Sequence, residues 1–127
     1  METLIHLDTH VVAWLFMGDR KRLKPVAKTL EGSDLAISCI VPLELQYLFE
    51  IGRATEPAEA VISDLVGRVG LRMSEAPFAR VVREALRQSW TRDPFDRLIV
   101  ANALVENLPL LTFDENIRAH CSLAFWR

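Results

Sequence analysis

The chain has 127 residues, of which half are hydrophobic and a quarter are charged, and its formal net charge is −2 at pH 7. This length suits one domain, residues 1–127, that buries about two-thirds of the surface of its unfolded chain. The small net charge excludes a general electrostatic attraction to nucleic acid or to an anionic membrane. Any such binding must depend on local patches.

The two cysteines, Cys39 and Cys121, are far apart in the sequence, and we expect both to be small buried side chains with free thiols. The opening METLIHLDTH carries two acids and two histidines where a secretory signal needs a basic start and an apolar run. The densest apolar run, VVAWLFM, is too short to span a membrane. These features predict a soluble, cytoplasmic protein with no membrane segment.

Hydrophobic periodicity and turn residues divide the chain into short strands and amphipathic helices. Gly18 and Gly32 are natural helix ends, and the stretch 52–57 is a helix-to-helix connection. In chain order we predict a strand over 3–7, helices over 8–18 and 19–32, a strand over 35–39, helices over 42–53 and 57–67, a strand over 69–75, helices over 76–90 and 94–106, a strand over 108–113, a short helix over 114–120 and a last strand over 123–126.

Strands that alternate with helices predict an α/β fold. The sheet should be mostly parallel, with four to five strands and helices on both faces, because parallel neighbours cannot be joined by tight hairpins. Ligands of such sheets bind beyond the carboxyl ends of the strands. This edge is therefore where we look for chemistry.

The stretch TRDPFDRLIVANA, residues 91–103, begins a helix with two acids. Asp93 suits the N-cap, Pro94 the first helical position and Asp96 the third, which is capping chemistry and needs no further function. The stretch VPLE repeats the pattern, with Pro42 at the expected first helical position and Glu44 two residues later.

Four acids are expected at the same edge of the sheet. Asp8 follows the first strand and Asp114 follows the strand over 108–113, while Glu44 and Asp96 each begin a helix. Any one of them alone is explained by the helix dipole. Together they would repel one another and raise each other's pKa values unless a cation compensates.

Oxygen ligands without a nearby cysteine or histidine pair favour Mg²⁺ or Mn²⁺ over Zn²⁺. One or two such ions can activate water and stabilise both oxygens of an in-line phosphoryl displacement. The corresponding reaction is the hydrolysis of a phosphodiester.

Four segments in this order resemble PIN-domain ribonucleases, and within them the VapC-like toxins of bacterial toxin-antitoxin pairs. The segments are LDTH (7–10), ISCIVPLEL (37–45), RDPFDRLIVANAL (92–104) and LLTFDENI (110–117), of which RDPFDR is the most specific. The resemblance implies an RNA substrate. It implies the metal-binding and catalytic acids Asp8, Glu44, Asp96 and Asp114, with the supporting hydroxyls Thr9, Ser38 and Thr112.

Other residues near these acids have two interpretations. His10 either contacts substrate phosphate or packs beside the site, and we favour packing. Asp93 is near enough to replace Asp96 as a ligand, but its cap geometry assigns it to structure. The arginines next to the acids either hold the RNA backbone or pair with the acids; they are Arg92, Arg97 and Arg118.

The helices around 11–17 and 43–52 carry more apolar side chains than one buried stripe needs. The surplus residues are Trp14, Phe16, Tyr47 and Phe49. Core packing is the default for most of them, and any exposed remainder would form a groove for a partner helix. The resemblance to VapC toxins implies that this partner is an antitoxin, and it also implies a homodimer. Trp126 is expected in the last packed strand, and no run of aromatics predicts a platform for stacking single-stranded RNA.

Two alternatives to a nuclease remain. A phosphorylation-driven receiver domain has a similar length and an acidic Mg²⁺ pocket, but it needs paired acids after the first strand, a phosphate-accepting Asp after a middle strand and a late lysine. This chain has only Asp8 after LIHL, and no lysine follows Lys28. The second alternative is an inactive binding module with the same fold, whose acids only cap helices.

Overall fold

A parallel sheet runs through the middle of the molecule, with the strand order β3-β2-β1-β4-β5. The computed structural model describes residues 3–127, and its strands are all parallel over this range. The elements are β1 (Thr3–Leu7), α1 (Thr9–Met17), α2 (Arg20–Leu23), the 3-10 helix η1 (Lys24–Val26), α3 (Ala27–Glu31), β2 (Ser33–Ile37), α4 (Val41–Glu50), α5 (Ala58–Val69), β3 (Arg72–Met73), α6 (Phe78–Ala85), α7 (Pro94–Glu106), β4 (Leu110–Leu111), α8 (Glu115–His120) and β5 (Ala124–Phe125).

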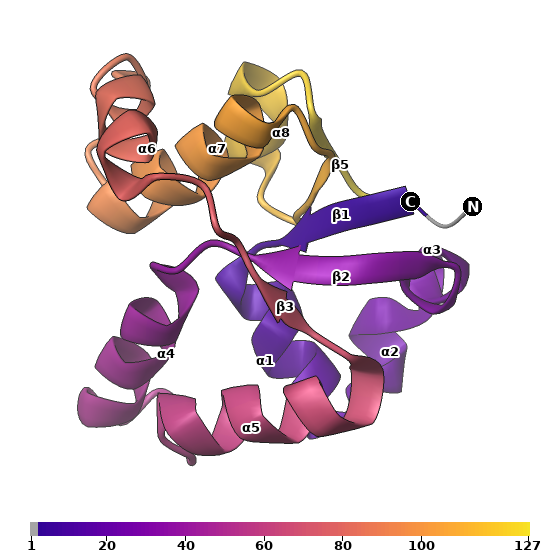
Figure 1. The fold of residues 1–127 in the computed structure, drawn as a ribbon. Helices are drawn as coiled ribbons and strands as arrows, with labels where there is room; N and C mark the ends of the chain where they lie inside the picture. Colours follow the sequence, from indigo (N-terminus) through magenta and orange to yellow (C-terminus); the bar gives the residue numbers. More distant parts are fainter. Residues whose placement is uncertain (1–2) are drawn as a thin grey trace.

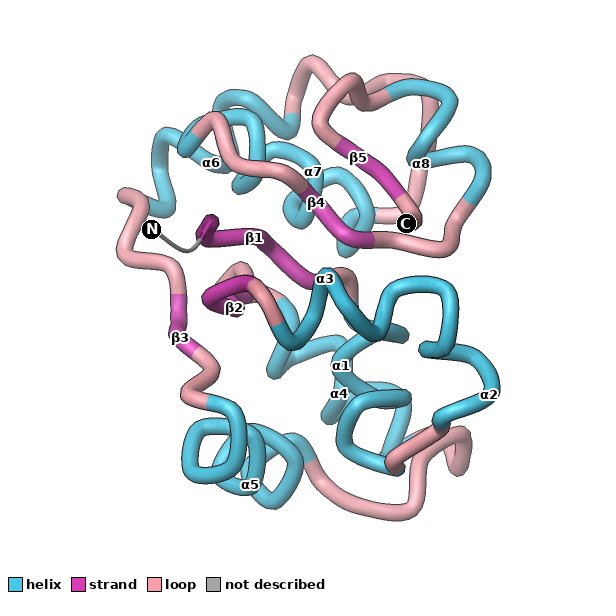
Figure 2. The backbone as a smooth tube through the Cα atoms, turned by 90° about the vertical axis from the view of Figure 1, so that its right-hand side faces the viewer, coloured by secondary structure: helices cyan, strands magenta, loops and turns pink. Residues whose placement is uncertain are grey.

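Helices cover both faces of the sheet, as the sequence predicts. Figures 1 and 2 show α1, α2, α4 and α5 on one face and α6, α7 and α8 on the other. Side chains of β1 alternate between these faces, so that His6 meets α7 while Ile5 and Leu7 join the main apolar core. This α/β architecture confirms the predicted fold class, with all five strands parallel instead of most of them.

The helix predicted over 19–32 is wrong as a single element. The chain instead forms α2, η1 and α3 in succession, and Pro25 lies in the 3-10 turn between the two α-helical pieces. Proline has no backbone N–H and crowds the preceding turn, so a continuous helix is interrupted there.

Several predicted boundaries also move. The strand predicted over 69–75 shrinks to β3, because α5 continues to Val69 and ends at Gly70 in the left-handed conformation (φ 68°). The helix predicted over 76–90 stops at Ala85, and the chain turns as the Gln88 N–H donates to the Ala85 carbonyl.

The second strand lies at 33–37 instead of 35–39, because its pairing with β1 begins at Ser33 opposite Thr3. Cys39 is therefore in the loop after the strand and is exposed, which contradicts the expectation that it is buried. Cys121 is buried, and both thiols are free as predicted. Within residues 3–127, no helix has the length and apolar character needed to cross a membrane.

Candidate active site

Asp8 is the most firmly held of the predicted acids. It lies between β1 and α1, is 3% exposed, and accepts a hydrogen bond from the Thr9 backbone N–H at its Oδ1 atom (2.8 Å). The Thr112 hydroxyl donates to its Oδ2 atom (2.7 Å). Two donors from two different strand ends therefore fix the orientation of this carboxylate.

Asp114 lies beside Asp8 because β1 and β4 pair in the sheet. Its Oδ1 atom caps α8 by accepting from the backbone N–H groups of Asn116 (2.8 Å) and Ile117 (3.0 Å). Its own N–H donates to the Thr112 hydroxyl (3.1 Å), so Thr112 links Asp8 and Asp114. The capping bonds use one oxygen of Asp114 and leave Oδ2 available to a ligand.

The opening of α7 has the predicted capping arrangement. Asp93 is the N-cap, and its Oδ1 atom accepts from the backbone N–H groups of Phe95 (2.8 Å) and Asp96 (3.2 Å). Pro94 and Asp96 occupy the first and third helical positions. Asp93 therefore has the structural role that the sequence assigns to it, although its charge still acts on the pocket.

The predicted repeat of this arrangement at α4 is displaced by one residue. The helix begins at Val41 with Ile40 as its N-cap, so Pro42 is at the second position and Glu44 at the fourth. The loop before it is held by Ser38, whose hydroxyl accepts from the Ile40 N–H (3.3 Å). Ser38 thus shapes the loop that carries Glu44 into the site.

Glu44 and Asp96 are the acids without compensation. Burial raises the pKa of Asp96 to about 7, and four carboxylates add to this rise by repulsion; in decreasing order they are Asp93, Asp8, Asp114 and Glu44. Burial also raises the pKa of Glu44 to about 7, with repulsion from Asp8 and Asp93, while the nearby Thr9 hydroxyl lowers it in part. Because Asp96 is repelled by all three other predicted acids, the four lie in one electrostatic pocket, which we call the acid pocket: Asp8, Glu44, Asp96 and Asp114.

The acid pocket suits a hydrated divalent cation better than a tightly enclosed one. Among residues 3–127, no three carboxylate, imidazole or thiol groups are close enough together to form a complete metal site. The Thr9 hydroxyl is buried next to Glu44, near enough to lower its pKa, but within residues 3–127 it has no partner in the geometry of a formed hydrogen bond. Mg²⁺ usually keeps several waters and uses one or two carboxylates, which agrees with both observations.

The three predicted arginines lie near the pocket but bind backbone carbonyls. Arg92 donates to the Ser89 carbonyl (2.7 Å), Arg97 to Thr91 (2.8 Å) and Arg118 to Phe113 (3.2 Å). No ion pair joins any of them to an acid within residues 3–127. The interpretation that they pair with the acids is therefore wrong for the described structure.

His10 is more closely tied to the site than packing alone implies. Its Nε2 atom accepts from the Phe113 N–H (3.0 Å), so the ring proton is on Nδ1, which faces the Asp8 Oδ2 atom at 3.4 Å. His10 also packs against Trp14, with ring centroids 4.9 Å apart. These contacts could not be predicted from the sequence, because they depend on Phe113 from a distant strand end.

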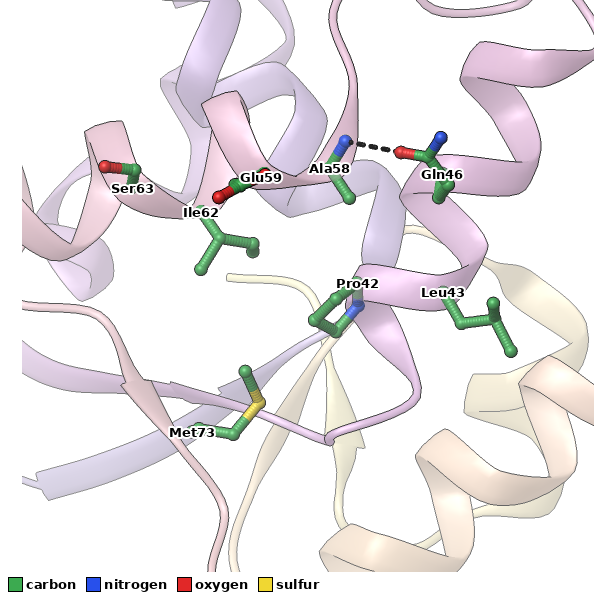
Figure 3. A pocket seen from close by; sticks show the side chains of 8 residues that line it. All are labelled: Pro42, Leu43, Gln46, Ala58, Glu59, Ile62, Ser63 and Met73. Carbon is green, nitrogen blue, oxygen red and sulfur yellow. Dashed lines mark hydrogen bonds between the residues drawn. The ribbon is translucent and has the colours of Figure 1, made fainter.

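A hollow on another part of the surface contains none of the four acids. It has a volume of about 600 Å³ and lies between α4, α5 and β3 (Figure 3). Its wall is mainly apolar, and the Gln46 side chain accepts from the Ala58 N–H there (3.1 Å). The residues drawn are Pro42, Leu43, Gln46, Ala58, Glu59, Ile62, Ser63 and Met73. This lining offers no cluster of catalytic groups.

The sequence matches a known protein family along most of its length. The model of the PIN domain family matches residues 5–123. The chain belongs to the PIN domain family. It is also 34% identical over 125 residues to Ribonuclease VapC22 of Mycobacterium tuberculosis, covering 93% of this chain and 92% of that protein.

Solved structures share the fold. A toxin-antitoxin complex from Klebsiella pneumoniae has a TM-score of 0.67 and 21% identity, with 95% of each chain covered. VapBC-1 from nontypeable Haemophilus influenzae has a TM-score of 0.67 and 20% identity, with 98% of this chain and 97% of that chain covered. VapBC2 from Rickettsia felis, bound to a promoter DNA fragment, has a TM-score of 0.64 and 18% identity, with 98% of both chains covered.

The topology excludes the receiver-domain alternative. Receiver domains have the doubly wound strand order 2-1-3-4-5, whereas this sheet has the order 3-2-1-4-5. The PIN family match agrees with this result.

Proposed function

We propose that this protein is a Mg²⁺- or Mn²⁺-dependent endoribonuclease that hydrolyses RNA phosphodiester bonds. The observation that carries this proposal is the pair Glu44 and Asp96, which are half-buried among other carboxylates and have pKa values raised to about 7. A folded protein keeps such uncompensated acids mainly at functional sites. The similarity to Ribonuclease VapC22 supports RNA as the substrate.

The metal would lie among the four acids of the acid pocket, bound by one or two of them directly and by the others through its waters. When bound, a divalent ion lowers the pKa of a water molecule and balances the charge on the phosphoryl oxygens. These acids present only oxygen atoms, the ligands that Mg²⁺ and Mn²⁺ prefer.

The surrounding residues keep the acids in position. Thr112 fixes Asp8 and Asp114 relative to each other, and His10 directs its Nδ1 atom toward Asp8. Ser38 supports the loop before Glu44, and the buried Thr9 hydroxyl has a free hydrogen-bonding capacity next to it. Removing a contact of this kind typically lowers metal affinity or activity by about 10- to 100-fold.

Arg92, Arg97 and Arg118 are the proposed contacts to the RNA backbone. Each uses one nitrogen to bind a backbone carbonyl near the pocket, which positions the guanidinium while other N–H groups remain for phosphate. Charge-assisted bonds of this kind orient a nucleic acid without reading its sequence.

We also propose that the enzyme is the toxin of a toxin-antitoxin pair, that it acts in the cytoplasm and that it forms a homodimer. The relative VapC22 and the VapBC structures support the antitoxin partner. A groove between α1 and α4 fits such a partner, because Phe16, Met17 and Leu48 line it. Trp14 and Phe16 are half-buried against the core, as expected, but Tyr47 and Phe49 are exposed, so the expectation that most of the four pack in the core is wrong.

The nuclease proposal is tested by incubating the purified chain with a mixed-sequence single-stranded RNA in Mg²⁺ or in EDTA. We expect cleavage only with the metal, and loss of cleavage in Asp8→Asn. An Asp8→Asn variant that cuts like the wild type would defeat the mechanism, and a wild type that never cuts would favour the inactive binding module.

The toxin proposal is tested by growth. Expression of the chain alone should arrest the culture, and coexpression with the adjacent gene should restore growth. Equal growth under both conditions would remove the toxin role without affecting the nuclease proposal.

A further inference from the structure

Three aromatic rings from distant parts of the sequence gather beside the acid pocket. Trp14 comes from α1, Phe113 follows β4 and Trp126 follows β5. Their ring centroids are 5.9 Å apart for Trp14 and Phe113, 5.3 Å for Phe113 and Trp126, and 6.0 Å for the two tryptophans. We call these three residues the aromatic shelf. Although the rings contact one another edge to face, Phe113 remains 52% exposed.

Basic side chains border the aromatic shelf. A surface hollow of about 740 Å³ is lined by all three rings together with Lys21, Arg22, Pro25 and one acid, Asp19. The Arg22 guanidinium lies 5.1 Å from the centre of the Trp14 ring and 3.5 Å from Asp19. Both contacts hold Arg22 at the hollow, while more than half of its side chain stays exposed.

The aromatic shelf is physically continuous with the acid pocket. Phe113 stands between Thr112, which holds Asp8, and Asp114. The Phe113 N–H donates to His10, whose other ring nitrogen faces Asp8 and whose ring packs on Trp14. A chain that placed a phosphate at the acids would therefore pass its neighbouring base close to Phe113.

We propose that the aromatic shelf is a nucleobase subsite for single-stranded RNA, in which the base next to the cleaved bond stacks on Phe113 and Lys21 and Arg22 take a neighbouring phosphate. This inference rests on the proposed nuclease function. Stacking on an exposed ring is the general way in which proteins bind single-stranded nucleic acid, because every base has a π-face. Positive charge beside the ring suits a phosphate-bearing ligand better than an apolar peptide.

The first test measures RNA binding in an Asp8→Asn background, which should bind without cutting. Fluorescence anisotropy of a labelled mixed-sequence RNA is compared with and without Phe113→Ala. We expect Phe113→Ala to weaken binding about 5- to 150-fold, the range for loss of one stacked base, and Phe113→Trp to preserve it. The matched control is Phe78→Ala, which removes an equally exposed ring (49%) from α6 and should leave binding unchanged.

The second test uses the same protein and a series of RNAs with one abasic residue at each position in turn. With Phe113 present, an abasic residue at one position should weaken RNA binding. The same abasic residue should have no effect in Phe113→Ala, because both changes remove the same stacking contact. Thermal melting verifies that each variant is folded.

The outcomes separate the two proposals. If the wild type cuts RNA but Phe113→Ala binds RNA as tightly as its parent, the subsite is wrong and the nuclease stands, and the shelf is then a protein contact or packing. The subsite would also be wrong if the loss of affinity caused by each abasic residue simply added to the loss caused by Phe113→Ala. If the wild type neither cuts nor binds RNA, the nuclease proposal fails and the subsite fails with it.

Discussion

Glu106 and Asp96 lie at opposite ends of α7, and their carboxylates have opposite surroundings. The Glu106 Oε1 atom accepts three hydrogen bonds, from His6 Nε2 (2.7 Å), the Ser74 hydroxyl (2.8 Å) and Asn102 Nδ2 (2.8 Å). The Asp96 carboxylate accepts none from residues 3–127 and is surrounded by other acids instead.

The helix dipole alone would predict the reverse. A carboxylate is favoured in the first turn of a helix, where Asp96 lies, and disfavoured in the last turn, where Glu106 lies. Burial and repulsion nevertheless raise the pKa of Asp96 to about 7. The Glu106 carboxylate is thus supplied with three donors, whereas the Asp96 carboxylate has none within residues 3–127, which fits the proposal that a ligand balances its charge.

His6 supports the structural role of Glu106 at this end of α7. Burial is the main cause that lowers the pKa of His6, although the bond and the charge of Glu106 act in the opposite direction. The ring is therefore a neutral donor that holds Glu106 against the sheet. We expect no catalytic role for this network.

The largest expected effect separates the two ends of α7 by activity. Asp96→Asn removes a proposed metal ligand and should lower kcat/KM for RNA cleavage at least about 100-fold, more than the usual effect of an outer contact. Glu106→Gln makes the same chemical change at the other end and should cleave at close to the wild-type rate. If both variants lost cleavage equally, the contrast would be without functional meaning.

A smaller loss is expected when the support of Asp8 is removed. Thr112→Val eliminates the hydroxyl that joins Asp8 to Asp114 and should reduce cleavage about 10–100-fold, with partial recovery at high Mg²⁺. Thr29→Val, which removes a hydroxyl bonded to the distant Arg127 carbonyl, is the control and should be active. Full activity in Thr112→Val would show that Asp8 needs no such support.

For stability, the variant expected to show a loss is Glu106→Gln, which is the one expected to keep its activity. Glu106→Gln converts three charge-assisted hydrogen bonds into neutral ones and should lower the free energy of unfolding by about 1–2 kcal/mol in urea titrations. Glu31→Gln, at an exposed position, should change it by less than about 0.5 kcal/mol. An unchanged free energy of unfolding in Glu106→Gln would mean that the negative charge of Glu106 does not stabilise the fold.

The last expected effect is the pH dependence of stability without metal. Glu44 and Asp96 have folded-state pKa values raised to about 7, so between the unfolded-state values and pH 7 the folded state binds more protons than the unfolded state. Stability in EDTA should therefore fall as the pH rises from about 4 to 7 and then level off. Asp96→Asn should melt a few degrees above the wild type at pH 8 and show a weaker pH dependence; the same melting temperature for both proteins would contradict the assigned repulsion.

The sequence predicted those parts of the site that depend on local chemistry. The Asp93 cap, the position of Asp96 in α7 and the location of Asp8 and Asp114 after strands follow from residue types at fixed spacings. The short strands were less accessible, because edge pairing is decided by tertiary contacts. The break at Pro25 follows from proline itself and could have been predicted.

Contacts between distant segments could not be predicted. The bonds of Glu106 join residues from β1, the loop after β3 and α7, and the aromatic shelf joins α1 with the ends of β4 and β5. The hydrophobic periodicity of a single segment does not reveal contacts between distant segments. No run of aromatics in the sequence predicts the aromatic shelf, because its three rings come together only on folding.

The most direct test of the account is calorimetric titration of Mn²⁺ into the metal-free protein at pH 8, with the wild type, Asp96→Asn and Glu106→Gln measured side by side. If the acid pocket is balanced by a divalent ion, the wild type and Glu106→Gln should bind Mn²⁺ with similar affinity, and Asp96→Asn should bind it far more weakly. No binding to the wild type, or equal binding to all three proteins, would contradict the claim that these buried carboxylates form a metal site.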